Sequence, residues 1–289
     1  MLSIATFSLV AKDPNSHDLG VVVASKFLAV GSVVPWLEAG VGAVATQSYA
    51  NTSFGARSLA LLKAGSSLSE IALNLEQSDP EHQSRQYGVV SASGSSYSFT
   101  GSECQPWAGG RYGQNYAAQG NLLTGADVID TLVETFLSRT ELPFPERLLG
   151  ALLAADKTGG DARGRQSASL YVARERGGYA GFNDRYIDLR VDDHATPILE
   201  LQRLLAMHRL LFERPNPDQL LPISGDIATR VLAVLHGAGQ NFYAWSKTAE
   251  VALTRLAGLE NLEERFTQIG FIDINALQYL EQKYNRTSR

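Results

Sequence analysis

The stretch that decides the fold is Ala5-Thr6-Phe7-Ser8-Leu9-Val10-Ala11, followed after a polar turn by Leu19-Gly20-Val21-Val22-Val23-Ala24-Ser25-Lys26. Both segments are rich in apolar and β-branched residues, so they predict two strands of a hairpin. In the first strand Thr6 and Ser8 alternate with Phe7 and Leu9, which places the two hydroxyls on one face. A hydroxyl at the start of such a strand is a candidate nucleophile, and it is equally an ordinary β-favoured residue.

The bulk composition excludes several classes of protein. The chain has 289 residues, 44% of them hydrophobic, a net charge of -5 and a single cysteine, Cys104. This supports a sizeable core, and the scattered basic residues predict no nucleic-acid partner. One cysteine excludes an internal disulfide framework, and the histidine spacing and the lack of a phosphate-binding loop predict no metal and no cofactor.

No targeting or membrane signal stands out in the sequence. We find neither a secretory signal peptide nor a stretch near the about 20 apolar residues that span a bilayer. The sequence therefore predicts a cytoplasmic protein that makes no membrane contact.

The order of elements predicts the architecture of residues 1–212. After the first hairpin we expect two helices, at 54–64 and from the capping-box sequence Ser67-Leu68-Ser69-Glu70 onward. Strands at 85–91, 97–101 and 116–121 come next, then helices from Thr124 and at 146–156, and finally strands at 168–172 and 187–191. This order favours an α+β fold, a four-layer αββα sandwich with two sheets face to face and helices outside both.

Residues 213–289 are predicted to form a separate, small all-α domain. The segment Arg214-Pro215-Asn216-Pro217-Asp218 has the composition of a linker, and helices are expected at 224–236, 242–259 and 275–284. The aromatic residues of this region are explained either by its own core or by a dimerisation surface. We expect a homo-oligomer.

Several separate stretches together resemble a bacterial family known as domain of unknown function 1028. They are Thr6-Phe7-Ser8-Leu9-Val10-Ala11-Lys12-Asp13-Pro14, Gly20-Val21-Val22-Val23-Ala24-Ser25-Lys26-Phe27, Val44-Ala45-Thr46-Gln47, Gln119-Gly120-Asn121-Leu122-Leu123 and Gly159-Gly160-Asp161-Ala162-Arg163-Gly164-Arg165-Gln166-Ser167-Ala168. The resemblance covers about residues 6 to 212. That family is similar to the N-terminal nucleophile hydrolases, which share the αββα architecture, and the helical tail is similar to a domain labelled as peptidoglycan-binding.

The resemblance implies an amide-bond hydrolase that acts on a small amide or peptide-like substrate. In such enzymes the first residue of the mature chain supplies both the attacking hydroxyl and a free α-amine that acts as the general base. By alignment this residue is Thr6, which requires loss of Met1-Leu2-Ser3-Ile4-Ala5, either by self-cleavage at Ala5-Thr6 or because the true start of the chain lies downstream. The acid and lysine of the proteasome pattern do not carry over, because the corresponding zones read Ser25-Lys26 and Ser32-Val33-Val34-Pro35.

The candidate site residues form two groups. Those expected to serve catalysis are Thr6, Ser25, Lys26 and Asp161. Those expected to bind substrate are the strand-end amides and the polar loop before the strand at 168–172, namely Gln47, Asn51, Gln119, Asn121, Arg163, Arg165, Gln166 and Ser167. Amides at strand ends can donate to an oxyanion, and the loop can present a cation beside acceptors and hydroxyls.

A second hypothesis comes from a different class of protein. It is a catalytically inactive αββα scaffold that binds a small polar or acidic ligand near Arg163 and Arg165. Its helical tail would then be an interaction module for peptidoglycan fragments or for another protein.

Overall fold

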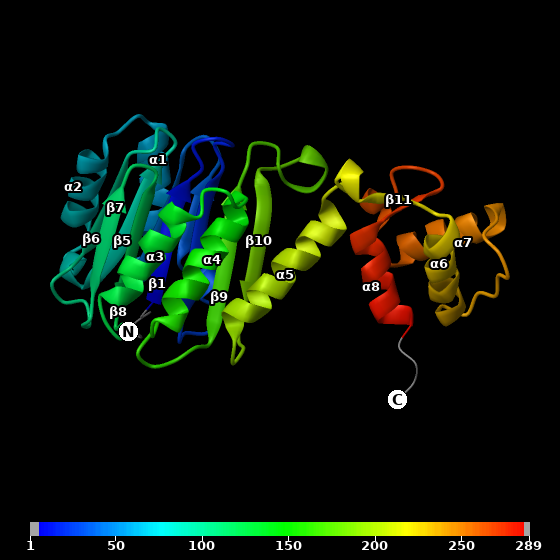
Figure 1. Cartoon of the computed structure of the whole chain (residues 1–289). Coiled ribbons are helices and arrows are strands. Elements are labelled where there is room, and N and C mark those ends of the chain that lie inside the picture. Colours follow the sequence, from blue (N-terminus) through cyan, green and yellow to red (C-terminus); the bar gives the residue numbers. More distant parts are fainter. Residues whose placement is uncertain (1–5, 286–289) are drawn as a thin grey trace. The chain divides into compact units, whose positions relative to one another are not determined.

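The computed structural model describes residues 6–285, and all structural statements below concern that part of the chain. It divides into two compact units, a first unit that ends at Arg203 and a second unit that begins at Leu204. The first unit is the four-layer αββα sandwich that the sequence predicts, drawn in Figure 1.

The larger sheet of the first unit has six strands in the order β10-β9-β2-β1-β8-β7. The first hairpin lies at its centre, because β1 pairs with β2 on one side and with β8 on the other, both antiparallel. The strands are β1 (Thr6–Lys12), β2 (Leu19–Ser25), β7 (Gly109–Gly113), β8 (Tyr116–Asn121), β9 (Ser167–Ala173) and β10 (Arg185–Val191).

The smaller sheet has four strands in the order β3-β4-β5-β6, and it packs face to face on the larger one. Its strands are β3 (Pro35–Glu38), β4 (Gly42–Ser48), β5 (Arg85–Ser91) and β6 (Ser96–Thr100). Buried valines and alanines of both sheets, among them Val10, Val23 and Ala45, fill the space between the sheets. Continuous burial along β1, β2 and β4 follows, because helices cover the outer face of each sheet.

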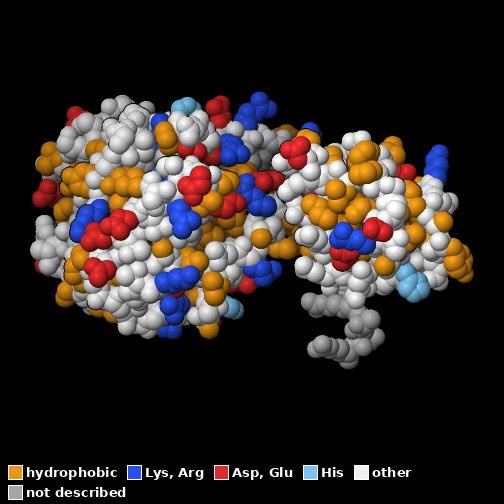
Figure 2. All heavy atoms as spheres, in the orientation of Figure 1, with side chains coloured by type: hydrophobic (Ala, Val, Ile, Leu, Met, Phe, Trp, Pro, Cys, Tyr) orange, Lys and Arg blue, Asp and Glu red, His pale blue; other side chains and the backbone are white. Residues whose placement is uncertain are grey.

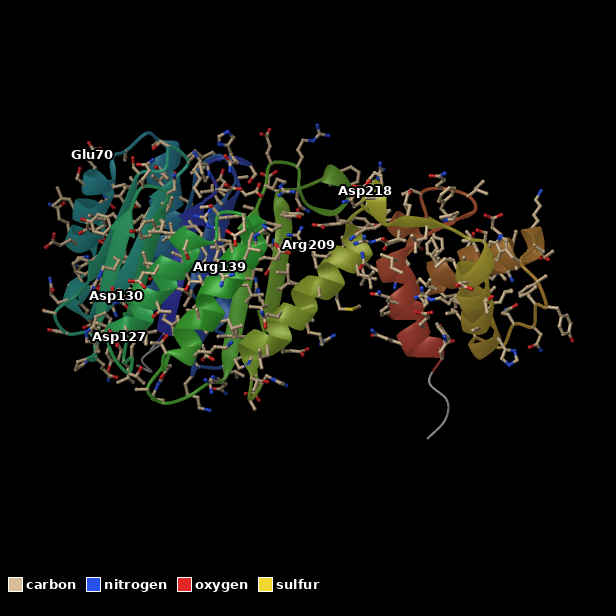
Figure 3. The ribbon with its side chains drawn as sticks, viewed as in Figure 1. Glu70, Asp127, Asp130, Arg139, Arg209 and Asp218 are labelled. Carbon is tan, nitrogen blue, oxygen red and sulfur yellow. The ribbon has the colours of Figure 1, made fainter. Side chains whose placement is uncertain are left out.

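Two pairs of helices form the outer layers (Figure 1). On the smaller sheet lie α1 (Ser53–Lys63) and α2 (Leu68–Ser78), and on the larger one α3 (Asp127–Ser138) and α4 (Phe144–Lys157). The predicted capping box of α2 is confirmed, since the Ser67 side chain accepts from the Glu70 amide and the Glu70 carboxylate accepts from the Ser67 amide. Glu70 is labelled in Figure 3 at the start of this helix.

The second unit is helical, as expected, with one addition. It contains α6 (Gly225–Gly237), α7 (Lys247–Leu259) and α8 (Ile274–Tyr284), while α5 (Pro197–Phe212) precedes them. A small ribbon of β11 (Leu220–Pro222) and β12 (Phe271–Asp273) joins its two ends. The second unit has its own core, formed by apolar side chains of these three helices together with Ile223 beside β11 and Ile272 in β12.

Two predicted helix starts are wrong. Helix α3 begins at Asp127 with Ala126 at its N-cap and not at Thr124, whose amide donates to the carbonyl of Gly160. Helix α7 begins at Lys247 and not at Phe242, because the Ser246 side chain caps the amide of Ala249. Both errors arise from local capping and loop contacts that apolar periodicity does not encode.

Candidate active site

Thr6 lies in a row of polar residues that crosses the larger sheet. It is opposite Ser25 of β2 and Asn121 of β8, and Ser25 is opposite Ser167 of β9. Residues directly opposite one another in antiparallel strands share a face, so all four side chains point to one side of the sheet. None is more than 2% exposed, and the Thr6 hydroxyl donates to Ser25 Oγ over 3.2 Å.

Asp161 anchors the loop that precedes β9. Its carboxylate, whose side chain is 1% exposed, accepts from the Lys26 amide at 2.9 Å and from the Arg163 guanidinium at 2.8 Å. Backbone pairing of Asp161 with Leu123 places the loop beside the end of β8. The structure therefore brings Asp161 to the Thr6 end of the sheet, where it holds the backbone after Ser25.

Three more of the predicted site residues form hydrogen bonds or ion pairs with other residues of this region. The Lys26 side chain is exposed, and its Nζ donates to the carbonyl oxygen of Arg165 at 3.3 Å, so it does not extend toward Thr6. The Arg165 guanidinium binds the carboxylate of Asp156 at 2.8 Å. The Gln166 amide donates to Asp193 at 3.1 Å, which also keeps that side chain on the surface.

Five amide and hydroxyl side chains between the two sheets form a continuous hydrogen-bonded set, which we call the amide ladder. The Ser8 hydroxyl donates to Gln47 Oε1 at 2.6 Å and accepts from Gln119 Nε2 at 2.7 Å. Gln86 Oε1 accepts from Gln47 Nε2 at 2.8 Å and from Asn121 Nδ2 at 2.9 Å. All five members, Ser8, Gln47, Gln86, Gln119 and Asn121, have no exposed surface.

The amide ladder gathers three of the four strand-end amides that the sequence nominated, and it adds Gln86. Sequence reasoning missed Gln86 because nothing in the strand Arg85–Ser91 distinguishes it from a surface glutamine. The sequence offered no signal for it, because its partner Asn121 is 35 residues away in the chain and meets it only through the packing of β5 on β8.

The structure does not bring Asn51 to this site. Its Nδ2 donates to Asp79 at 2.8 Å and its Oδ1 accepts from the Ser53 amide, so it serves the start of α1. Asp79 is bound in turn by the buried guanidinium of Arg85, and that hydrogen bond lowers the pKa of Asp79 to about 2.

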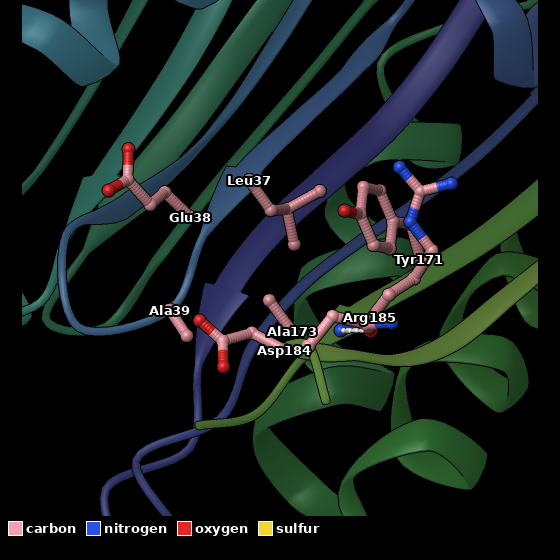
Figure 4. Close-up of a pocket in the computed structure, with 8 residues that line it drawn as sticks. Leu37, Glu38, Ala39, Tyr171, Ala173, Asp184 and Arg185 are labelled. Carbon is pink, nitrogen blue, oxygen red and sulfur yellow. Dashed lines mark hydrogen bonds between the residues drawn. The ribbon is translucent and has the colours of Figure 1, made fainter. Parts of the chain in front are cut away.

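The roomier hollows of the first unit lie at the other end of the sandwich. One of about 480 Å³ is lined by Leu37, Tyr171 and Arg185, among others, and Figure 4 shows Tyr171 facing Leu37 across it. Ala173 at its edge pairs with Leu19, which pairs with Lys12, the last residue of β1. At about 3.3 Å per residue, the hollow is roughly 20 Å from Thr6.

One hollow near the Thr6 end, among the described residues, is narrow. The hollow lined by Ser25, Arg165 and Ser167 has essentially no room for a water molecule. On the face shown in Figure 2, acidic and basic side chains are interspersed over the first unit. Within residues 6–285 we find no group of three acidic, histidine or cysteine side chains suited to a metal ion, and no helix long and apolar enough to cross a membrane.

By its fold the protein belongs to the class of αββα sandwiches, and the central strand β1 of its larger sheet begins with the buried Thr6. Residues 6–201 match the model of a family of unknown function, DUF1028, and the chain belongs to that family. Residues 211–280 match a model described as "Putative peptidoglycan binding domain".

A solved structure agrees with the family match. The crystal structure of protein SPO2555 from Silicibacter pomeroyi, also matched to DUF1028, is similar to this chain with a TM-score of 0.64 and 29% sequence identity. The similarity covers 78% of this chain and 88% of that one. No curated protein matches the chain.

Proposed function

We propose that the chain is an amide-bond hydrolase whose nucleophile is the hydroxyl of Thr6, acting from a free N-terminus. The observation that carries this proposal is the position of Thr6, at the start of the central strand with its side chain in the polar row between Ser25 and Asn121. The family match and the αββα layers support it, because N-terminal nucleophile hydrolases share that architecture and that position.

The chemistry requires only groups that a terminal threonine carries. An α-amine has an ordinary pKa of about 8, so near neutral pH it accepts the Oγ1 proton as Oγ1 attacks the substrate carbonyl. The resulting ammonium returns the proton to the leaving nitrogen as the C–N bond breaks, which leaves an ester on Thr6. Water, deprotonated by the same amine, then attacks the ester and releases the acid.

The proposal makes activity depend on processing. Thr6 has no exposed surface, and its amine becomes free only when the bond between Ala5 and Thr6 is cleaved. Ala5 lies outside the described residues. Cleavage there makes Thr6 the first residue of the chain and gives it the free amine that the mechanism needs.

Neighbouring residues have supporting roles in this proposal. Ser25 Oγ, which accepts a hydrogen bond from Thr6 Oγ1 at 3.2 Å, orients the nucleophile. Asp161 fixes the backbone at Lys26, and Arg163, Arg165 and Gln166 form the rim over which substrate passes. The alternative of an acidic-ligand scaffold is less well supported, because both arginines bind carboxylates of the chain itself.

The peptidoglycan-binding match suggests the substrate class. Peptidoglycan contains short peptides joined by amide bonds, so we propose that the second unit binds that polymer while the first hydrolyses a peptide-like amide. The full chain should co-sediment with purified peptidoglycan and not with cellulose, an insoluble polysaccharide that has no peptides. Equal retention on both, or none on either, would remove this part of the proposal.

The nucleophile is tested by covalent labelling. A β-lactone probe, which acylates hydroxyl nucleophiles, should add its own mass once per chain, and peptide mapping should place the adduct on a chain that begins at Thr6. Thr6→Ser should retain labelling, whereas Thr6→Ala should lose it. Thr46→Val, which removes another buried hydroxyl on β4 hydrogen-bonded to the Asn51 carbonyl, is the matched control and should label like the wild type.

Intact mass decides the mechanism independently of the substrate. A sample that reacts with the probe at Thr6 while keeping Met1 would contradict the free-amine mechanism. Full labelling of Thr6→Ala would contradict the choice of nucleophile.

A further inference from the structure

Backbone carbonyls fix the orientation of the side-chain amides in the ladder. Gln86 Nε2 lies 2.7 Å from the carbonyl oxygen of Gly120, which can only accept a hydrogen bond. The amide nitrogen of Gln86 must therefore face Gly120, and its Oε1 must face the other way. This settles an assignment that is otherwise ambiguous for glutamine, because oxygen and nitrogen are nearly alike in size.

The same logic passes to Asn121. Since Gln86 presents Oε1, Asn121 must present Nδ2 to it, as the 2.9 Å contact requires. Asn121 Oδ1 then points away from Gln86. That oxygen is buried and has no hydrogen-bond partner among residues 6–285, although Asn121 is opposite Thr6 and shares its face of the sheet.

A buried, unpartnered acceptor is costly, so it needs an explanation beyond packing. Gln47 strengthens the case, because its Nε2 also approaches the Thr6 carbonyl oxygen at 3.3 Å and so ties the ladder to the first residue of β1. The ladder thus fixes both the backbone of Thr6 and the side chain of Asn121, the residue opposite Thr6 on β8.

We propose that Gln86 is a positioning residue, which holds Asn121 so that its Oδ1 accepts a hydrogen bond from the free α-amine of Thr6. This rests on the proposed function, since only a processed chain has that amine. An acceptor at the amine favours its protonated form and so raises its pKa, and it aims the lone pair of the neutral amine toward Oγ1.

The test measures the rate at which the β-lactone probe labels Thr6 as a function of pH. Gln86→Met removes the acceptor for Asn121 and lets that amide turn, so labelling should slow by roughly tenfold to hundredfold and its pH midpoint should fall. Asn121→Asp places a negative charge beside the amine, so the midpoint should rise. Opposite shifts from two substitutions in one hydrogen bond are not expected of a purely structural role.

Gln86→Glu is the conservative variant. A protonated glutamic acid donates to Gly120 and accepts from Asn121 as glutamine does, so labelling below neutral pH should stay within about threefold of the wild type. Thr46→Val again controls for the loss of a buried hydrogen bond on the opposite face of β4, and thermal unfolding of every variant shows which remain folded.

The two proposals fail differently. If the wild-type chain shows no adduct at Thr6, both are overturned. If it shows the adduct, and Gln86→Met or Asn121→Asp leaves the rate and the pH midpoint unchanged, only the positioning role is overturned.

Discussion

Ser8 on β1 and Gln47 on β4 join the two sheets through a hydrogen bond of 2.6 Å from Ser8 Oγ to Gln47 Oε1. The same hydroxyl accepts from Gln119 Nε2, so Ser8 links two amides of the ladder, Gln47 on β4 and Gln119 on β8. Gln47 Nε2 also donates to the carbonyl oxygen of Gln119 at 3.3 Å. A polar layer therefore runs through an otherwise apolar interior, and it lies at the end of the sandwich that carries Thr6.

Ser8→Ala should destabilise the first unit. The substitution leaves Gln47 Oε1 and Gln119 Nε2 buried without that partner, so the free energy of unfolding should fall by about 2 to 4 kcal/mol. Urea denaturation at neutral pH measures it. Ser16→Ala removes an exposed hydroxyl bound to Asp13 and should change stability by less than about 0.5 kcal/mol. A change in the free energy of unfolding for Ser8→Ala as small as that for Ser16→Ala would contradict a stabilising role of the ladder.

Gly88 reports how closely the sheets approach. A Cβ added at Gly88 on β5 would lie 2.0 Å from Gln119 Oε1 on the facing sheet. Gly88→Ala should therefore displace Gln119 and destabilise the protein by about 1 to 3 kcal/mol. Gly150 on α4 is the matched control, since a Cβ there meets nothing within 4 Å, and Gly150→Ala should stabilise by about 1 kcal/mol. A neutral Gly88→Ala would contradict this close packing.

The four layers of the sandwich were predicted well from the sequence, because the patterns that predict its strands and helices are local. Alternation in β1, the capping box at Ser67 and Glu70, and the order of strands and helices all lie within short windows of the chain. The hydroxyls of the first strand and the polar loop around Asp161 were also nominated from local residues, and the family resemblance added the role of Thr6 as a terminal nucleophile. These features needed no knowledge of which strand faces which.

The partners of the polar residues could not be predicted in this way. Gln86 meets Asn121 only because β5 packs over β8 in one particular register, 35 residues apart in the chain. Asn51 lies shortly after β4 and Asn121 is the last residue of β8, yet Asn51 is bound by Asp79 at the start of α1. Strand-end position nominated both equally, and tertiary packing separates them.

The buried pair of Asp79 and Arg85 should make the first unit sensitive to acid. Side chains of both are 6% exposed, and the hydrogen bond from Arg85 lowers the pKa of Asp79 to about 2 from its ordinary value of 3.8. A depressed pKa gives stability that is present above the ordinary value and is lost as the pH falls through the lowered one. We expect a loss of about 2 kcal/mol between pH 4 and pH 2.

Asp79→Asn tests this assignment. It should destabilise the protein at neutral pH by about 3 to 5 kcal/mol, because Arg85 loses a buried partner, and it should remove that part of the acid dependence. Urea denaturation across the pH range measures both. Asp130→Asn, on the exposed face of α3 beside Arg111 and labelled in Figure 3, should change neither by more than about 0.5 kcal/mol. An unchanged acid slope in Asp79→Asn would refute the pair as its source.

Glu260 should hold the end of α7 against α8 in the second unit. Burial by itself raises the pKa of Glu260, but hydrogen bonds from Lys283 and Tyr284 outweigh it, so the pKa is lowered overall. The Tyr279 hydroxyl adds a third donor at 3.2 Å. Glu260→Gln removes the charge that these donors share, and we expect the protection of α8 against hydrogen exchange to fall by about 1 to 3 kcal/mol at neutral pH.

The protection of α8 against hydrogen exchange should also depend on pH in a direction set by the pKa of Glu260. Since the folded-state pKa of Glu260 is lowered, wild-type protection of α8 should weaken as the pH falls through it, and Glu260→Gln should be flat over that range. Glu263→Gln, three residues further on and exposed, should behave as the wild type does. Hydrogen exchange followed by mass spectrometry on peptides from residues 274–284 measures each variant. Unchanged protection of α8 in Glu260→Gln would contradict the role of Glu260 in holding α8.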